Sequence, residues 1–192
     1  MYRIDSSGNQ RPIYENGGMR FDLASSDDEN FKHRFEMIDI FGLRSGLTAK
    51  YHHEFMFPNE FNEPDERFLV QQFKHQLSDT DHSPMLSLKV ENNDLFYTQR
   101  TIPSGHDPDE SESDRIKIIR NKWYSFDLDV TWGYRVVDKP WTPHTKIVCN
   151  GQVIRDDYIT NDYNITGDIV HRIGPYVWKW GTINTQTIYA RL

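Results

Sequence analysis

The sequence predicts an all-β fold, a two-sheet antiparallel sandwich, and three observations support this prediction. Short runs rich in β-branched and aromatic residues recur along the chain, with turn-forming residues between them. Helix signals are weak, because the longest helical candidate, Arg115–Val130, contains the β-favouring run Trp123–Val130. About ten strands can be assigned, and that number favours a jelly roll over an immunoglobulin-type sandwich.

The predicted strands are short segments in which β-favouring residues alternate or cluster. They are Phe31–Ile40, Lys50–Phe57, Phe68–Gln76, Met85–Val90, Leu95–Thr101, Trp123–Thr131, Thr145–Cys149, Gln152–Asp157, Val170–Trp178 and Gln186–Arg191. Dipeptides typical of turns lie between several of them, at Pro58-Asn59, Asn92-Asn93 and Asn150-Gly151. The pair Asn150-Gly151 lies between the runs KIVC and QVIR, and it predicts a two-residue hairpin with a type I′ turn.

The chain of 192 residues fits one large domain. Residues 1–30 are rich in Gly, Ser and Asp, and they are predicted to form an N-terminal arm or an edge segment, followed by a single jelly-roll domain over residues 31–192. The acidic segment Ser104–Asp114 is predicted to be a solvated surface loop, since it combines high charge with few apolar residues. Aromatic residues make up 14% of a chain that is 36% hydrophobic, which predicts a core built from large rings.

Charge and composition argue against several classes of function. The net charge of −7 and the lack of a Lys/Arg cluster argue against nucleic-acid binding, and an anionic ligand would need a local positive site. No apolar run reaches the roughly 18 residues of a membrane span. The N-terminus lacks the apolar segment of a secretory signal, so we expect a protein made in the cytoplasm that is virion-associated or released by lysis if it acts outside the cell. The single cysteine, Cys149, excludes an intrachain disulfide and is expected to be a small buried hydrophobe.

The strand predicted over residues 68–76 carries the clearest functional pattern. Gln72, Lys74 and Gln76 occupy every second position, and the side chains of a strand alternate in direction, so these polar groups share one face. Phe73 points to the other face. A row of amide and amine groups on one face of a sheet can hydrogen-bond a polar ligand such as a sugar.

Several segments form an ordered set of short motifs. They are R-x-E at Arg34–Glu36, a strand ending in Pro at Tyr51–Pro58, Q-x-K at Gln72–Lys74, S-P-x-L-x-L at Ser83–Leu88, the strand between Trp123 and Trp132, N-G at Val148–Gly151, and G-x-Y at Ile173–Tyr176. Together they resemble the polysaccharide lyases of the heparin-lyase-I-like and glucuronan-lyase-like type, which have a concanavalin-A-like jelly-roll fold. The resemblance covers roughly residues 31–190, and the shared order and spacing of the motifs carry it.

The resemblance implies a polysaccharide lyase that cleaves a uronate-containing, anionic glycan by β-elimination. In such a reaction the C5 proton is removed beside a carboxylate, so the transition state carries additional enolate-like charge. Three groups are then required: a donor that neutralises the carboxylate, a base that takes the proton, and an acid that protonates the leaving glycosidic oxygen.

The resemblance assigns candidate catalytic roles to four residues and a supporting role to Glu36. Gln72 would donate hydrogen bonds to the substrate carboxylate, with Arg34 and Lys74 as cationic helpers. Glu36 shares a strand face with Arg34 and could orient it and contribute to substrate binding. Tyr176 matches the tyrosine of the family's G-x-Y strand and would act as acid or base. Many members place histidine two residues after the glutamine, where this chain has Lys74.

Four further residues are candidates from their neighbourhood. His171 and Arg172 are close to Tyr176 in sequence and could lower its pKa or bind substrate. Trp178 shares a strand face with Tyr176 by alternation and could stack against a sugar ring. His53, in the strand YHHEF, is the alternative base.

Other chemistries find no support in the sequence. Zinc, calcium-loop, P-loop and G-x-S-x-G motifs do not occur, so no metal or cofactor is predicted. The alternative function is a non-catalytic jelly roll that binds carbohydrate or another protein, for example a virion tail or decoration component with virion or homo-oligomer contacts. The missing secretion signal and the lysine at position 74 motivate this alternative.

Overall fold

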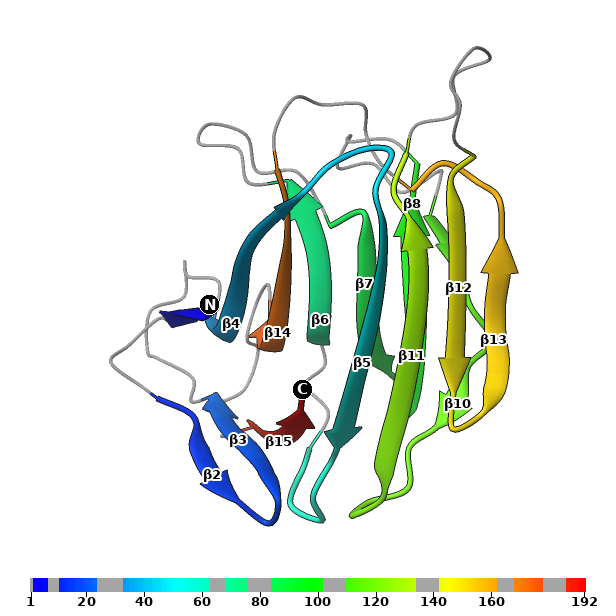
Figure 1. Ribbon diagram of the computed structural model, residues 1–192. Helices are drawn as coiled ribbons and strands as arrows, with labels where there is room; N and C mark the ends of the chain where they lie inside the picture. Colours follow the sequence, from blue (N-terminus) through cyan, green and yellow to red (C-terminus); the bar gives the residue numbers. More distant parts are fainter. Residues whose placement is uncertain are drawn as a thin grey trace.

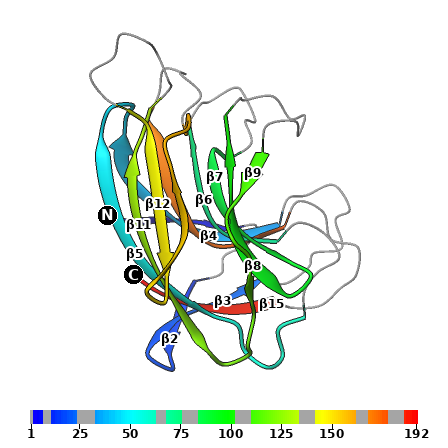
Figure 2. The same cartoon turned by 90° about the vertical axis from the view of Figure 1, so that its right-hand side faces the viewer.

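The computed structural model describes residues 2–6, 11–23, 33–62, 68–75, 84–101, 110–133, 142–161, 168–177 and 186–192. These residues form fifteen β-strands and no helix, arranged as two antiparallel sheets that pack face to face (Figures 1 and 2). The predicted all-β sandwich is therefore confirmed. In the described part of the chain there is consequently no helix with the length and apolarity needed to cross a membrane.

The first sheet contains the strand predicted to face a ligand. Within the described residues its eight strands follow the order β1 (Tyr2–Ser6), β4 (His33–Leu43), β14 (Ile169–Val177), β6 (Phe68–His75), β7 (Leu86–Glu91), β8 (Asp94–Arg100) and β10 (Ile116–Lys117), with β9 (Glu110–Glu112) also pairing with β8. The segments that carry the R-x-E, G-x-Y and Q-x-K motifs thus become the three neighbouring strands β4, β14 and β6.

The second sheet covers one face of the first, and Figure 1 looks onto its strands β5, β11, β12 and β13. Its order in the described residues is β13 (Gln152–Asp157), β12 (His144–Cys149), β11 (Trp123–Thr131), β5 (Thr48–Met56), β15 (Gln186–Arg191), β3 (Gly18–Leu23) and β2 (Ile13–Glu15). The first sheet therefore has an inner face, toward the second sheet, and an outer face turned away from it.

Large rings fill the space between the two sheets, as the composition predicts. In β11, Phe126, Leu128 and Val130 are at most 2% exposed, while the intervening Asp127 and Asp129 point outward. Burying one large apolar side chain such as that of Phe126 stabilises the fold by about 2 kcal/mol. Cys149 lies in the same core, and burial raises the pKa of its thiol to about 12. The prediction that Cys149 is a small buried hydrophobe is therefore confirmed.

Each of the ten predicted strands is present, and β11, β13 and β15 have the predicted bounds. The Asn150-Gly151 turn joins β12 to β13 with φ values of 48° and 83°, so both residues are left-handed, as a type I′ turn requires. The N-terminal segment supplies β1 at the edge of the first sheet and β2 and β3 at the edge of the second, with Phe21 and Leu23 in the core.

One prediction about the acidic segment needs correction. Its residues Glu110–Glu112 form strand β9, which pairs with β8, and Ser113 is buried, so this half is not a solvated loop. The physical reason is that Glu110 accepts hydrogen bonds from Lys89 and Arg100, which offset its charge. Residues 104–109 lie outside the described residues.

Candidate active site

The outer face of the first sheet brings together polar residues of β4, β14 and β6. Arg172 lies opposite Gln72 of β6 on one side and Ile38 of β4 on the other. Tyr176, further along β14, lies opposite Arg34 of β4. Residues directly opposite one another in neighbouring strands project to the same face, so the strand register alone places these positions on one surface.

Two of these side chains, those of Gln72 and Arg172, meet at the carboxylate of Glu36 on β4. The amide nitrogen of Gln72 donates a hydrogen bond to Oε1 of Glu36, and Nη1 of Arg172 lies 3.4 Å from Oε2 of the same carboxylate. Glu36 is fully buried, Gln72 is 4% exposed and Arg172 is 9% exposed. Charge attraction and hydrogen bonding are strong in such a desolvated setting, so Glu36 fixes the positions of the amide and the guanidinium.

The backbone of β14 explains how Glu36 reaches across a strand to Gln72. Gly174 lies between Arg172 and Tyr176, at a register shift of β14, and its φ of 132° favours glycine. Because glycine has no side chain, no β14 side chain separates Arg172 from Tyr176 on the outer face. Tyr176 is 9% exposed and two outer-face positions from Arg172, roughly 13 Å along the strand.

The remaining outer-face candidates are placed by their strands. Lys74 follows Gln72 on the same face of β6 and is partly exposed. Arg34 lies in β4, opposite Tyr176, and its side chain is outside the described residues, as is the whole of Trp178. The described contacts of the Glu36 carboxylate are with Gln72 and Arg172, and the predicted pairing of Glu36 with Arg34 lies outside the described residues.

The structure does not bring His53 and His171 to this surface. Both lie between the sheets, where the amide nitrogen of Gln71 is 3.2 Å from Nδ1 of His53 and 2.7 Å from Nε2 of His171. The hydroxyl of Tyr97 donates to the Gln71 carbonyl oxygen, and Phe73 stacks on the His171 ring at 4.4 Å. Strand alternation separates adjacent residues: His171 faces the interior and Arg172 faces outward.

Burial keeps the two interior histidines neutral. It lowers the pKa of His53 to about 3, with a smaller contribution from His52, and it holds the pKa of His171 well below the usual value. Neutral rings provide the unprotonated nitrogens that accept hydrogen bonds from the Gln71 amide. This arrangement is a satisfied polar network inside the core, and it stands on the other side of the sheet from Gln72.

The polar surface around Gln72 continues onto β7, β8 and β9. Ser87 lies opposite Gln72 and Thr98 opposite Ser87, with their hydroxyl oxygens 2.9 Å apart. Beyond them, Glu110 accepts hydrogen bonds from Lys89 and, at 2.8 Å, from Nη2 of Arg100. Lys89 and Arg100 are not among the residues predicted from the motifs, although the alternation in S-L-K and T-Q-R could have placed them on the face of Gln72.

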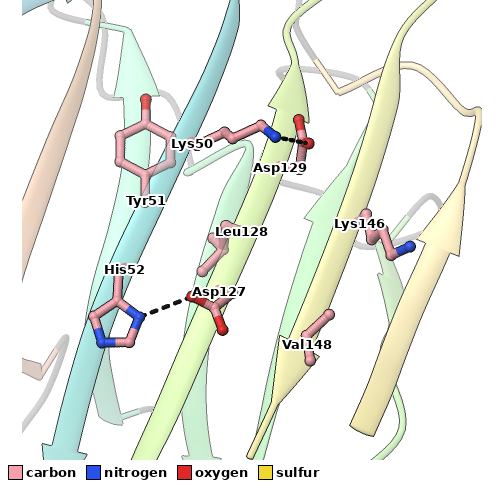
Figure 3. Close-up of a pocket in the computed structure, with 8 residues that line it drawn as sticks. All are labelled: Lys50, Tyr51, His52, Asp127, Leu128, Asp129, Lys146 and Val148. Carbon is pink, nitrogen blue, oxygen red and sulfur yellow. Dashed lines mark hydrogen bonds and ion pairs between the residues drawn. The ribbon is translucent and has the colours of Figure 1, made fainter. Parts of the chain in front are cut away.

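A shallow pocket of about 400 Å³ lies on the opposite side of the sandwich, on the outer face of the second sheet (Figure 3). Its charged residues are paired across strands, Lys50 with Asp129 at 3.3 Å and His52 with Asp127 at 2.8 Å. Exposed pairs of this kind contribute about 0–1 kcal/mol each. Within the described residues no cluster of side chains is arranged to hold a metal ion, either here or around Gln72.

Comparison with known proteins assigns the family. A family model described as polysaccharide lyase matches residues 8–190, which is nearly the whole chain. The chain belongs to the polysaccharide lyase family. This membership confirms the resemblance that the ordered motifs indicate in the sequence. A search of curated protein sequences found no match.

Solved structures of lyases share the fold of this family member. An endo-β-1,4-glucuronan lyase from the fungus Trichoderma reesei matches with a TM-score of 0.74 and 12% identity, over 98% of this chain and 84% of that one. An alginate lyase from Pseudomonas aeruginosa matches with a TM-score of 0.63 and 12% identity, over 92% and 82% of the two chains. A family 7 alginate lyase in complex with its product matches with a TM-score of 0.61 and 13% identity, over 91% and 77%. These likenesses confirm the jelly-roll sandwich.

Proposed function

We propose that this protein is an active polysaccharide lyase that cleaves a uronate-containing glycan by β-elimination on the outer face of β4, β14 and β6. The observation that carries the proposal is the shared contact of Gln72 and Arg172 with the Glu36 carboxylate, on the face that also presents Tyr176. Two of the structural relatives are a glucuronan lyase and an alginate lyase, and both of these polymers are polyuronates.

The Gln72 amide is suited to neutralise a substrate carboxylate. An amide nitrogen has two N–H donors, so donation to Glu36 leaves a second donor for a ligand. Arg172 and Lys74 add positive charge on the same face, which supplies the local positive site that an acidic protein needs to bind an anionic polymer. In the transition state, when the carboxylate gains enolate-like charge, these donors bind more strongly than in the ground state.

Tyr176 is the proposed acid and base. As the phenolate it takes the C5 proton, the electron pair of the C5–H bond forms the C4–C5 double bond, and the C4–O bond breaks. The phenol then returns the proton to the leaving glycosidic oxygen, so the residue ends in its starting state. A nearby cation favours the phenolate; on this face Arg34 lies opposite Tyr176, and Arg172 lies four residues before it on β14. The interior histidines His53 and His171 take no part in this scheme.

The test is to incubate the protein with glucuronan, alginate, heparin and hyaluronan and to follow the ultraviolet absorbance of an unsaturated uronate product. We expect product from at least one polymer, loss of essentially all activity in Tyr176→Phe, and normal activity in Tyr158→Phe. Tyr158 is an exposed tyrosine beside the second sheet and serves as the matched control. No product from any of the four polymers, or full activity of Tyr176→Phe, would refute the proposed chemistry and favour a binding protein.

A further inference from the structure

The carboxylate of Glu110, on the outer face of the first sheet, is largely shielded from water, with 12% of its side chain exposed, and it is bound by two cations. Glu110 of β9 accepts hydrogen bonds from the Lys89 ammonium of β7 and from the Arg100 guanidinium of β8, the latter at 2.8 Å. Thr98, two residues before Arg100 on the same face of β8, helps to lower the pKa of the Glu110 carboxyl. Lys89 is 9% exposed and Arg100 is 7% exposed, so the carboxylate is bound out of bulk water.

The electrostatics of this cluster favour an ionised carboxylate. Burial would raise the pKa of the Glu110 carboxyl, but the hydrogen bond and charge of Lys89 and the charge of Arg100 outweigh that effect and lower it. Glu110 is therefore charged at neutral pH. The two cations, with the Thr98 hydroxyl on the same face, form a cradle that stabilises a carboxylate, whichever molecule the carboxylate belongs to.

The cradle lies in register with Gln72. Gln72 is opposite Ser87 on β7, and Ser87 is opposite Thr98 on β8, so Thr98 lies two strand spacings from Gln72, about 10 Å. Figure 2 shows β7, β8 and β9 side by side at this part of the molecule. A single oligosaccharide chain laid across the strands from Gln72 would reach Thr98.

We propose that Lys89, Arg100 and Thr98 form a second carboxylate subsite, which binds another uronate residue of the same glycan and which Glu110 occupies until the glycan displaces it. The proposal rests on the proposed function, because it takes the ligand to be a polyuronate. Exchanging one carboxylate for another conserves the charge of the buried cluster, so displacement avoids leaving Lys89 and Arg100 without a counterion.

The position of Glu110 permits this exchange without loss of the strand. β9 has three residues, and Ser111 and Glu112 have their own contacts: Arg155 donates to the Ser111 hydroxyl at 2.7 Å, and Arg115 binds Glu112 at 3.0 Å. The main chain of β9 is therefore anchored when the Glu110 side chain leaves the cradle. Glu112 also supplies a matched control, because it has the same charge and lies in the same strand, and its described ion pair is with Arg115 rather than with Lys89 or Arg100.

The test compares Glu110→Gln, Glu112→Gln and Lys89→Gln, each combined with Tyr176→Phe to prevent turnover. The probe is a β-1,4-glucuronan oligosaccharide, and the neutral control is a cello-oligosaccharide of equal length, which has the same linkage without carboxylates. We expect the dissociation constant for the glucuronan oligosaccharide to fall about tenfold in Glu110→Gln, because the competing carboxylate is gone, and to rise about tenfold in Lys89→Gln. Glu112→Gln should bind like the parent, and the neutral control should not respond.

Thermal stability gives a second readout with the opposite sign. Glu110→Gln should melt at a lower temperature than the parent without ligand, and saturating glucuronan oligosaccharide should raise its melting temperature more than that of the parent. Lower stability without tighter binding, or no binding in any variant, would overturn the subsite. Turnover by the unsubstituted protein is measured separately. If it cleaves glucuronan but the variants bind with unchanged dissociation constants, only the subsite is refuted. If Glu110→Gln binds more tightly but the unsubstituted protein does not cleave, only the lyase activity is refuted.

Discussion

The protein should lose stability between neutral and mildly acid pH because His53 is buried in its neutral form. Its Nδ1 accepts a hydrogen bond from the Gln71 amide at 3.2 Å, and the ring is 4% exposed. Protonation would place a charge in the desolvated space between the sheets, near His52, and it would also turn the hydrogen-bond acceptor into a donor that faces the amide. The folded state therefore resists protonation, and the pKa of His53 falls from 6.5 to about 3.

The sign and size of the effect follow from this shift. The unfolded chain binds the proton below about pH 6.5, whereas the folded protein does not until about pH 3, so the stability present above pH 6.5 is lost as the pH falls toward 3. At about pH 5 the unfolded state has gained about 2 kcal/mol relative to the folded state from His53 alone. For a chain of this length that corresponds to a melting temperature lower by about 4–8 °C. His171, whose pKa is also lowered by burial, adds to the loss.

The assay is thermal and urea unfolding at several values between about pH 5 and pH 7.5, a window above the range in which carboxylates titrate. His53→Gln should reduce the pH dependence of the free energy of unfolding in this window. His52→Gln is the matched control, because His52 is exposed on the other face of the same strand and pairs with Asp127. If His53→Gln loses as much stability as the parent over this window, the reasoning about the interior network is wrong.

Two further predictions concern single contacts. Glu36→Gln removes the carboxylate that Gln72 and Arg172 share. We expect kcat/KM on the polymer that the protein cleaves to fall about a hundredfold, while circular dichroism shows that the fold is retained. Activity within twofold of the parent would contradict the role of Glu36 in positioning Gln72 and Arg172. Gly18→Ala would bring its Cβ within 2.7 Å of the Trp123 ring, so thermal unfolding should show a loss of about 1–3 kcal/mol. Gly151→Ala, where no described atom lies within 4 Å, should show only the cost of left-handed backbone, about 1–2 kcal/mol. Unchanged stability of Gly18→Ala would argue against the clash.

The strands that alternation identifies were predictable, and those formed by polar segments were not. Trp123–Thr131 and Gln152–Asp157 show clear β-patterns, and the structure has the same bounds. β3 could have been assigned, because Phe21 and Leu23 alternate with polar residues and lie in the core. Strand β9 gives no such signal in its E-S-E sequence, since its stability depends on cations of β7 and β8 that are distant in the chain.

The site could be predicted only as far as strand faces. Alternation places Gln72 with Lys74, and Arg172 with Tyr176, and both assignments agree with the register of the sheet. The same rule separates His171 from Arg172, yet closeness in sequence suggested that both would serve Tyr176. What no local pattern reveals is which side chains meet across strands, such as Glu36 with Gln72, because that depends on how the sheet is assembled.

Strands β6 and β14 each present consecutive residues to two different environments. Gln71 and His171 belong to the neutral network between the sheets, whereas Gln72 and Arg172 contact the Glu36 carboxylate on the outer face. Any change that disrupts the inner network acts on the same backbone that positions the outer residues. Protonation of the interior histidines therefore provides a route by which acid would reduce activity without titrating a group that contacts the substrate. An acid limit of this kind would coincide with the loss of stability and would move with His53→Gln, whereas titration of a catalytic group would leave the limit unchanged in that variant.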